Sequence, residues 1–581
     1  MKKTDRRAIL LRCIIGSIIG ITMFVIIYGV SPLNVKNDTW ILSGYSEWDI
    51  QQDYAGWINY RNSSWNFPIA QADKMGFPAE KGVNIAFTDS VPLISAFFKL
   101  FDPVLPETFQ WYGLYEITAF ALQGIAAMLL LGYFAVSIIP SIVGTFFFIS
   151  PILIERSFRH IALSSHYIIL FALLLYFKYR KKGVYPWKSM AVLSILSVGT
   201  TPYFLPMVMI FVLALCVDNI ISRYSWKKAA AFFSFNIVIG LLTAYCIGTI
   251  GNGYSAGREG YGYYSMNMNA LINPVSQGKY LWSKILPKRM QLYGQYDGFN
   301  YIGVGVLALM ITAVVLAIID YKRNKSFAVN FFKRNITLFA VCAFLTVFAV
   351  SNVVCFDDVE ILNIHLPAFV LNLCSIFRAS SRLFYPVYYV VILASIILLQ
   401  RFSLNYMGHS NQCRNVVWQK ADIYVFVLAL CLLIQCYDLS GIFEVKHNEM
   451  NAKNQLDMRI PDKLTNLKEY NCLFVSEQWG SRYQLIVAGY NDLLSNGIDT
   501  NTRSREHFKT DEFSASIHGE LERGVLRKDT VYSTRDFAEY GCWRSAFDGA
   551  AEFVVWDMRQ IPNTHILEES QVIYFMIPHT F

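Results

Sequence analysis

Long apolar segments recur along this chain, and they constrain its fold more than any other feature. Each has close to the roughly 20 residues that a helix needs to cross the apolar part of a bilayer. Only 16% of the residues are charged, and 54% are hydrophobic. A soluble core does not need repeated apolar runs of this length, so the sequence predicts a polytopic α-helical membrane protein. About eleven spans are expected, at residues 8–30, 108–133, 135–153, 163–178, two short segments within 188–223, 229–250, 300–320, 336–354, 384–400 and 421–439.

The positive charges predict how these spans are oriented. The net charge is +8, but Lys and Arg gather in short loops between the spans, which is typical of cytoplasmic loops and excludes a nucleic-acid partner. The N-terminal MKKTDRR is then cytoplasmic. The apolar run after it is too long for a signal peptide and lacks a small-residue cleavage site, so we expect an uncleaved first span. The stretch Lys188–Arg223 is basic at both ends, and two short spans meeting near Pro202 keep both ends inside.

The long polar segments are expected on the opposite, extracytoplasmic side. Residues 1–439 form the transmembrane module, with a first outer loop at 31–107 and a second at 251–299. The second loop is rich in Gly, Tyr and Asn, which is typical of a mobile loop over a site. The C-terminal region 440–581 contains the strand-like strings CLFVSEQW, QLIVAGY and AAEFVVWDM and the helix- or turn-like strings KLTNLKEY and STRDFAEYG. It is predicted to be a small extracytoplasmic α+β domain.

The segment Gly44–Trp65, GYSEWDIQQDYAGWINYRNSSW, is the strongest candidate for a functional site. Asp49 and Asp53 are four residues apart, so on a helix both carboxylates share one face. Several aromatic residues, Trp57 among them, surround the two carboxylates. Such a segment beside a membrane suits a hydroxylated substrate. The same composition is also typical of an ordinary interfacial loop with an aromatic belt.

A third carboxylate, Asp89, follows in the string FTDSVPL. It either supports the first two or caps the helix that is expected to begin near Val91. The apolar segment 91–101 is too short to cross a bilayer, so we expect a re-entrant or interfacial helix there.

Charged side chains also gather where later spans meet the outer surface. Ionisable groups at bilayer level are costly, and this makes them functional candidates. The alternative for each histidine is a satisfied polar group at the end of a span. The outer turn after the span at 135–153 carries an unusual density of polar residues, namely Glu155, Arg156, Arg159, His160 and His166.

Arg378 and Arg382 form a second basic candidate at the outer mouth of the span at 384–400. Four residues separate them, so they are predicted to share a helix face. Such a pair can bind phosphate oxygens through charge-assisted hydrogen bonds. The alternative is that both side chains extend toward lipid headgroups.

Four strings resemble a known superfamily: DIQQDYAGW, FTDSVPL, HIALSSHYIILFALLLYFK and FRASSRLFYPVYY. Together with the acidic first outer loop and the outer C-terminal domain, they resemble a bacterial branch of the GT-C type integral-membrane glycosyltransferases over residues 44–400. The resemblance implies a GT-C-like fold in the cytoplasmic membrane. It also implies that a sugar is transferred on the outer face, from a polyprenyl-phosphate-linked donor to a hydroxyl acceptor on a glycan or another cell-envelope component.

The resemblance also assigns roles to residues. Asp49 is expected to be the catalytic base of an inverting reaction, with Asp89 as a supporting carboxylate. Asp53 is the third catalytic candidate, at a position where relatives are expected to carry another polar residue. The expected substrate- and phosphate-binding residues are Gln52, Trp57, Arg159, His160, His166, Arg378 and Arg382.

No metal site is predicted, although some GT-C enzymes need a divalent cation, and that requirement is left open. The sequence shows no dense carboxylate cluster, and its eleven cysteines show no metal-ligand spacing. Cys472 and Cys542 both fall in the polar C-terminal region, where a disulfide between them is one option.

Three other functions fit parts of the pattern. A transporter or flippase has many spans, but it usually shows paired halves and polar groups near the midplane. A membrane acyltransferase needs a histidine deep in a span, for which His160 and His166 are candidates. A non-catalytic polysaccharide-assembly partner would use the outer tail for binding.

Overall fold

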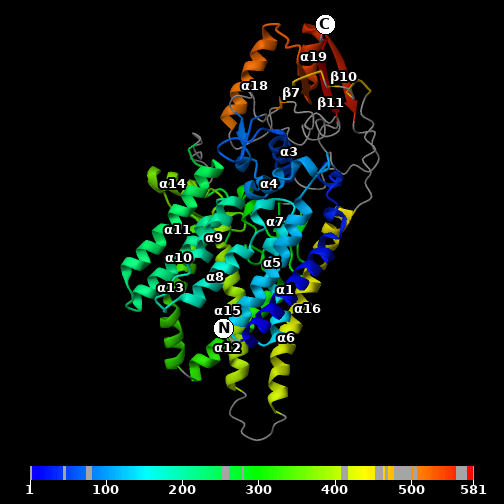
Figure 1. Cartoon of the computed structure of the whole chain (residues 1–581). Helices are drawn as coiled ribbons and strands as arrows, with labels where there is room; N and C mark the ends of the chain where they lie inside the picture. Colours follow the sequence, from blue (N-terminus) through cyan, green and yellow to red (C-terminus); the bar gives the residue numbers. More distant parts are fainter. Residues whose placement is uncertain are drawn as a thin grey trace.

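The structure is a computed structural model, and most of the chain in it is helical (Figure 1). It describes residues 3–42, 48–73, 82–251, 261–277, 280–323, 325–406, 416–451, 462–464, 467, 469–476, 499–500, 507–557 and 572–579.

Every predicted span coincides with a helix. In the described part of the chain, nine helical segments are long and apolar enough to cross a membrane, which indicates a multi-pass membrane protein. Helices α6 and α9, where two further spans were expected, have only 11 and 14 residues. The helices at the predicted spans are α1 (Lys3–Tyr28), α5 (Tyr112–Tyr133), α6 (Ile138–Phe148), α8 (Tyr167–Tyr179), α9 (Trp187–Thr200), α10 (Phe204–Ile221), α11 (Trp226–Ile247), α12 (Val304–Arg323), α13 (Lys325–Val350), α15 (Tyr385–Tyr406) and α16 (Val416–Asn451).

Two of the basic loops contact each other at one end of the helical bundle. Lys181 Nζ donates to the carbonyl of Arg334 at 2.7 Å, and Arg180 donates to Asn335 Oδ1 at 2.8 Å. Gly183 N donates to Asn219 Oδ1 at 3.2 Å, which joins the start of α9 to the end of α10. The hairpin expected from the two basic ends of 188–223 is therefore present. Which end faces the cytoplasm stays a prediction from the sequence.

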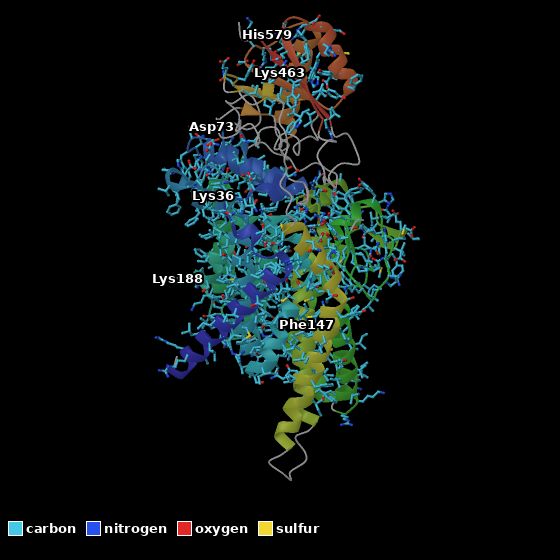
Figure 2. All side chains as sticks on the ribbon, turned by 90° about the vertical axis from the view of Figure 1, so that its right-hand side faces the viewer. Lys36, Asp73, Phe147, Lys188, Lys463 and His579 are labelled. Atoms are coloured by element: carbon cyan, nitrogen blue, oxygen red, sulfur yellow. The ribbon has the colours of Figure 1, made fainter. Side chains whose placement is uncertain are left out.

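The first outer loop folds into short elements at the opposite end of the bundle. Figure 2 shows its residues Lys36 and Asp73 lying between Phe147 of α6 and the C-terminal residues Lys463 and His579. As expected, α4 is too short to cross a membrane, with eight residues. The elements of this loop are η1 (Ser31–Leu33), α2 (Thr39–Leu42), α3 (Trp48–Asn62), β1 (Gln71–Ala72), β2 (Val83–Asn84), η2 (Ile85–Phe87), α4 (Pro92–Lys99) and η3 (Asp102–Val104).

The second outer loop differs from its prediction. Many of its described residues, among 261–277 and 280–299, are buried, whereas residues 284–293 are half-buried or exposed. Trp282 is completely buried, and Met266 N donates to the carbonyl of Ala349 at 2.8 Å. Buried asparagines and Asp297 supply the polar contacts that a loop of this composition needs in order to pack. The other elements at this end are α7 (Pro151–Arg156), η4 (Ile161–Leu163), β3 (Val275–Ser276), β4 (Tyr280–Leu281), η5 (Tyr293–Gly298), β5 (Val353–Phe356), β6 (Val359–Asn363), α14 (Ala368–Ser375) and η6 (Ser380–Phe384).

The C-terminal region contains a five-stranded sheet with strand order β10-β11-β9-β7-β8. Strands β7, β8 and β9 pair in parallel, and β11 pairs antiparallel with both β9 and β10. Figure 1 shows the sheet at the same end of the molecule as α3 and α4. Its elements are η7 (Asp462–Leu464), β7 (Cys472–Val475), β8 (Asp499–Thr500), α18 (His507–Glu522), β9 (Thr530–Thr534), α19 (Phe537–Ala546), β10 (Ala551–Asp557) and β11 (Val572–Pro578).

Strands β7 and β10 and helix α19 match three of the strings expected to fold. The string QLIVAGY lies outside the described residues, as does part of KLTNLKEY. Cys472 is buried, Cys542 is exposed, and both are free thiols, so the disulfide considered from the sequence is not present. The boundary expected at residue 440 falls inside α16, which continues to Asn451.

Helices α1 and α5 pack closely through glycines. Gly16 and Gly20 of α1 face Gly124 and Phe120 of α5, and a Cβ added to Gly20 would lie 2.1 Å from the carbonyl oxygen of Phe120. Small residues four apart let two membrane helices approach to backbone contact. This contact fixes the helix that leads into the first outer loop.

We therefore expect Gly20→Leu to separate α1 from α5 and to lower the free energy of unfolding by about 1–3 kcal/mol, as overpacking typically does. The measurement is the thermal unfolding midpoint of the purified protein in detergent. Ile18→Leu is the matched control, because Ile18 is 58% exposed on the same helix. Equal midpoints for the two variants would contradict the close packing.

Candidate functional site

A buried aspartate, Asp297, holds two arginines at the end of the bundle opposite the basic loops. Arg156 Nη1 lies 2.6 Å from Asp297 Oδ1, and Arg382 Nη2 lies 2.9 Å from Asp297 Oδ2. Arg156 also donates to the Asp297 carbonyl at 2.9 Å and to the Tyr385 hydroxyl at 2.8 Å. All three charged side chains are buried. Buried charges are stable only when they are paired and hydrogen-bonded in this way.

His160 and Asp49 extend this group toward solvent. His160 Nε2 lies 3.8 Å from Asp297 Oδ1 and 3.4 Å from Asp49 Oδ2. The Asp49 side chain, in the first turn of α3, is 29% exposed, compared with 5% for Asp297. We call these five residues, Asp49, Arg156, His160, Asp297 and Arg382, the charged cluster.

The charge states in the cluster follow from burial and from the arginines. Burial alone raises the pKa of Asp297, but Arg156 and Arg382 hold that pKa below its ordinary value, so the carboxylate stays ionised. Burial lowers the pKa of His160 well below its usual range, and Arg382, Arg159 and Arg156 lower it further. His160 is therefore neutral. Two positive guanidinium groups share one buried carboxylate, which leaves an excess positive charge beside Asp49.

The three acidic candidates, Asp49, Asp53 and Asp89, lie in different environments in the structure. Asp49 belongs to the cluster, whereas Asp53 is fully buried on α3, where its carbonyl accepts a hydrogen bond from Ser90 Oγ at 2.7 Å. Asp89 is half-buried with a φ of 62°. It is not the N-cap of α4, because that position is Val91.

The aromatic and amide candidates on α3 face the protein interior. Trp57 is completely buried, and its indole N–H donates to the carbonyl of Phe109 at 2.9 Å. Its ring packs edge-to-face against Phe109 and Trp111. A ring that binds a substrate by stacking must have a face that the substrate can reach, so this placement does not fit the substrate-binding role expected for Trp57. Gln52 is buried as well.

The arginine pair does not share a helix face, which corrects the prediction from its spacing. Arg382 lies within the 3₁₀ helix η6, whereas Arg378 precedes that helix. Arg378 is exposed over the ring of Tyr264, at 5.4 Å from its centroid. Arg382 is buried, with its guanidinium 4.7 Å from the centroid of Tyr203. A 3₁₀ segment has three residues per turn, so a spacing of four no longer aligns side chains.

Arg159 and His166 are buried next to the cluster. Arg159 forms an ion pair with Glu155, and Gln277 Nε2 approaches the same Glu155 carboxylate at 3.3 Å. His166 Nδ1 shares a hydrogen bond of 2.7 Å with the Tyr389 hydroxyl. The alternative of a satisfied polar group therefore holds for Nδ1, whereas Nε2 is buried without a hydrogen-bond partner among the described residues.

Sequence reasoning missed Asp297 as a site residue. It is one charged residue among many in a loop that looked mobile, and no local motif marks it. Only the buried position of the arginines, each of which needs a counter-charge, points to a carboxylate partner.

The charged cluster has few side-chain atoms that could bind a metal ion. Among the described residues, no group of three or more His, Cys, Asp and Glu side chains is arranged to hold one. The carboxylate oxygens of Asp297 are already bound by Arg156 and Arg382.

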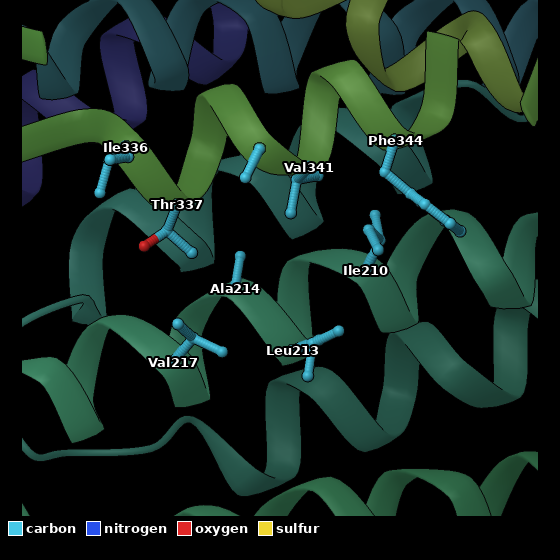
Figure 3. A pocket seen from close by; sticks show the side chains of 9 residues that line it. Ile210, Leu213, Ala214, Val217, Ile336, Thr337, Val341 and Phe344 are labelled. Carbon is cyan, nitrogen blue, oxygen red and sulfur yellow. The ribbon is translucent and has the colours of Figure 1, made fainter. Parts of the chain in front are cut away.

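An apolar groove of about 430 Å³ lies between α10 and α13 (Figure 3). Thr337 is the one polar residue among those that line it, and it donates to Asp218 at 2.8 Å. The ends of both helices that lie opposite the basic loops lead to the charged cluster. Tyr203, which lies under Arg382, directly precedes α10, and Ser380 Oγ of η6 donates to the carbonyl of Ala349 in α13 at 3.1 Å.

A family model described as "Domain of unknown function (DUF6311)" matches residues 17–440, more than half of the chain. The chain belongs to this family. A comparison with curated proteins gave no match. In this DUF6311 protein the matched residues contain the whole charged cluster and the groove, and the C-terminal sheet lies outside them.

We expect Asp297→Asn in this DUF6311 protein to lower the free energy of unfolding by about 3–5 kcal/mol, because it leaves two buried guanidinium groups without a counter-charge. Thermal unfolding in detergent measures the loss. The control is Asp320→Asn, which breaks the half-exposed pair with Arg401 and is expected to cost about 0–1 kcal/mol. Equal losses in the two variants would show that the buried pairing adds no more to the free energy of unfolding than the half-exposed pair does.

His160 predicts a pH dependence of stability. Its folded-state pKa is lowered, so below about pH 6.5 the unfolded chain binds a proton that the folded protein does not. Stability attributable to His160 is then lost as the pH falls, by up to about 1.4 kcal/mol per pH unit. Unfolding midpoints of wild type and His160→Gln between pH 7.5 and 5 measure this slope, which the variant should reduce. His365→Gln, at an exposed position, should keep the wild-type slope.

Proposed function

We propose that this protein is a membrane glycosyltransferase that moves a sugar from a polyprenyl-phosphate donor to a hydroxyl acceptor on the outer face of the cytoplasmic membrane. The observation that carries the proposal is the convergence of Asp49 and Arg382, far apart in the chain, in one charged cluster. His160 and Asp297 link them through distances of 3.4, 3.8 and 2.9 Å. A proton acceptor and a phosphate-binding cation are the two groups that such a transfer needs.

Asp49 is the proposed general base. It is the most exposed acid of the cluster and so can reach an acceptor hydroxyl. A neutral His160 that carries its proton on Nε2 can donate toward Asp49 and hold the carboxylate in position. In the reaction, the acceptor O–H bond breaks and its proton goes to Asp49. The oxygen forms a bond to the anomeric carbon from the face opposite the phosphate, which inverts the configuration.

The excess positive charge is the proposed partner of the leaving phosphate. As the bond from the anomeric carbon to the phosphate oxygen breaks, negative charge grows on that oxygen. Arg382 and Arg156 place two guanidinium groups against only one buried carboxylate, and preorganised positive charge of this kind stabilises a developing anion. The exposed Arg378 offers a further contact to phosphate oxygens.

The apolar groove supports a lipid-borne donor. Apart from Thr337, every side chain that lines the groove is a hydrocarbon, which suits an isoprenoid chain. Its nearest residue on α10, Ile210, is seven positions from Tyr203, a distance of about 10 Å along a helix. A chain in the groove would therefore bring its phosphate end toward Arg382.

Asp49→Asn tests the proposal, because an amide cannot accept the proton. The rate of sugar transfer is expected to fall by about 10²–10⁴-fold, the usual contribution of a general base. The assay follows release of polyprenyl phosphate from a set of radiolabelled polyprenyl-phosphate hexoses by the purified protein.

The matched control is Asp358→Asn, an exposed carboxylate on the loop between β5 and β6, which should keep full activity. The unfolding midpoint of Asp49→Asn should stay close to that of wild type. Full activity of a folded Asp49→Asn enzyme would remove the proposed base, and a wild type inactive on every donor of this class would overturn the function.

A further inference from the structure

The C-terminal sheet has a switch in strand order at the carboxyl ends of two parallel strands. Strands β8 and β9 lie on opposite sides of β7, and the chain after β9 continues through α19 to β10, away from β7. The strands that follow β7 and β9 in the chain thus lie on opposite sides of the pair. In open sheets with parallel strands, ligands bind in the crevice that forms outside the carboxyl ends of such strands.

Four polar side chains meet at this point. Ser476 directly follows β7, and Thr534 is the last residue of β9. Glu539, in the first turn of α19, accepts hydrogen bonds from Ser476 Oγ at 2.5 Å and from Thr534 Oγ1 at 2.6 Å. His518 Nε2, from α18, lies 2.9 Å from Ser476 Oγ and 3.3 Å from Glu539 Oε1. We call these four residues the sheet-end cluster.

The available protons fix the charge state of this cluster. Ser476 has one hydroxyl proton, and its shortest contact is to Glu539, so His518 must donate through Nε2. His518 Nδ1 also donates, to the carbonyl of Ser514 at 2.7 Å. His518 is therefore an imidazolium paired with the Glu539 carboxylate. In agreement, the hydrogen bond with Glu539 raises the pKa of His518.

The arrangement suits binding rather than hydrolysis. In a Ser–His–acid triad the acid bonds Nδ1 and leaves Nε2 to accept the serine proton. Here the carbonyl of Ser514 holds Nδ1, and the serine proton points to Glu539.

The chemistry of the sheet-end cluster selects a class of ligand. The imidazolium and the carboxylate cancel, so neither an anion nor a cation gains from a net charge. The two N–H groups of His518 and the hydroxyl proton of Ser476 are used within the protein, so the cluster offers a ligand acceptor oxygens, which match the O–H donor of a neutral hydroxyl group. The His518 side chain is 38% exposed and that of Glu539 is 20% exposed, so a ligand can reach both. Phe537, 70% exposed at the start of α19, packs on Tyr574 and adds an aromatic face nearby.

We propose that the sheet-end cluster is a binding site for a neutral carbohydrate. The site lies outside the family match and outside the charged cluster, and it does not depend on the proposed transfer reaction. Glu539 and Ser476 accept hydrogen bonds from sugar hydroxyls, and His518, whose two N–H groups are already bound within the protein, holds these two acceptors in place.

The experiment uses the full chain in lipid nanodiscs free of glycolipid. Saturation-transfer difference NMR is recorded with glucose, galactose, mannose and N-acetylglucosamine, each alone, and phosphorus NMR follows inorganic phosphate. We expect binding of at least one sugar. The dissociation constant should rise at least tenfold in Glu539→Gln and in Ser476→Ala, which removes only a hydroxyl. Glu552→Gln, on β10 of the same sheet, should bind as wild type does.

The Asp49→Asn variant separates this inference from the proposed function. Sugar binding that is kept in Asp49→Asn and lost in Glu539→Gln and Ser476→Ala supports the sheet-end site. Binding lost only in Asp49→Asn would place the sugar in the membrane site and overturn this inference alone. Absence of sugar binding by wild type, a preference for phosphate, or unchanged binding in Ser476→Ala would overturn it as well.

Discussion

The pairing of buried charge around Asp297 is the constraint on which the end of the bundle opposite the basic loops depends. Asp297 contacts Arg156 across 141 residues and Arg382 across 85 residues of sequence. Removing Asp297 leaves two uncompensated guanidinium groups in a water-poor interior. The end of α7, the second outer loop and η6 must therefore meet. This explains why a loop rich in Gly, Tyr and Asn is packed against the bundle.

Other buried acids in the bundle are held differently. Asp438 accepts hydrogen bonds from the hydroxyls of Ser283 and Tyr301 and from the backbone of Val304. Asp218 is bound by the hydroxyls of Tyr176 and Thr337. Neutral donors satisfy both carboxylates within the protein. They act as packing contacts between helices, and neither joins a set of arginines as Asp297 does.

The charge and the solvent exposure of the cluster residues also change from the interior to the surface. Asp297 is buried and neutralised by its arginines, His160 is neutral, and Asp49 is the acid that solvent reaches. Positive charge therefore lies deeper than negative charge across a few ångströms. A substrate with a hydroxyl on one side and a phosphate on the other would match that order, and this complementarity joins the proposed base to the proposed phosphate site.

Local pattern determined much of the fold from the sequence alone. Apolar run length located every helix of the bundle, and the basic ends of 188–223 indicated the hairpin of α9 and α10, because both signals are local properties of the chain. The position of Asp49 and Arg382 near the ends of predicted spans marked them as candidates for the functional site. These local signals could not show that Arg378 and Arg382 sit on different faces, since that depends on a 3₁₀ turn set by its surroundings.

Only the tertiary structure decided which charges meet. The burial of Trp57 depends on Phe109 and Trp111, and the role of Asp297 depends on arginines far away in sequence. Hydrophobicity and charge are properties of single residues, so the sequence alone determines them. The pairing of one buried carboxylate with two distant guanidinium groups is a property of the packed chain, because it is the removal of water that makes the pairing necessary.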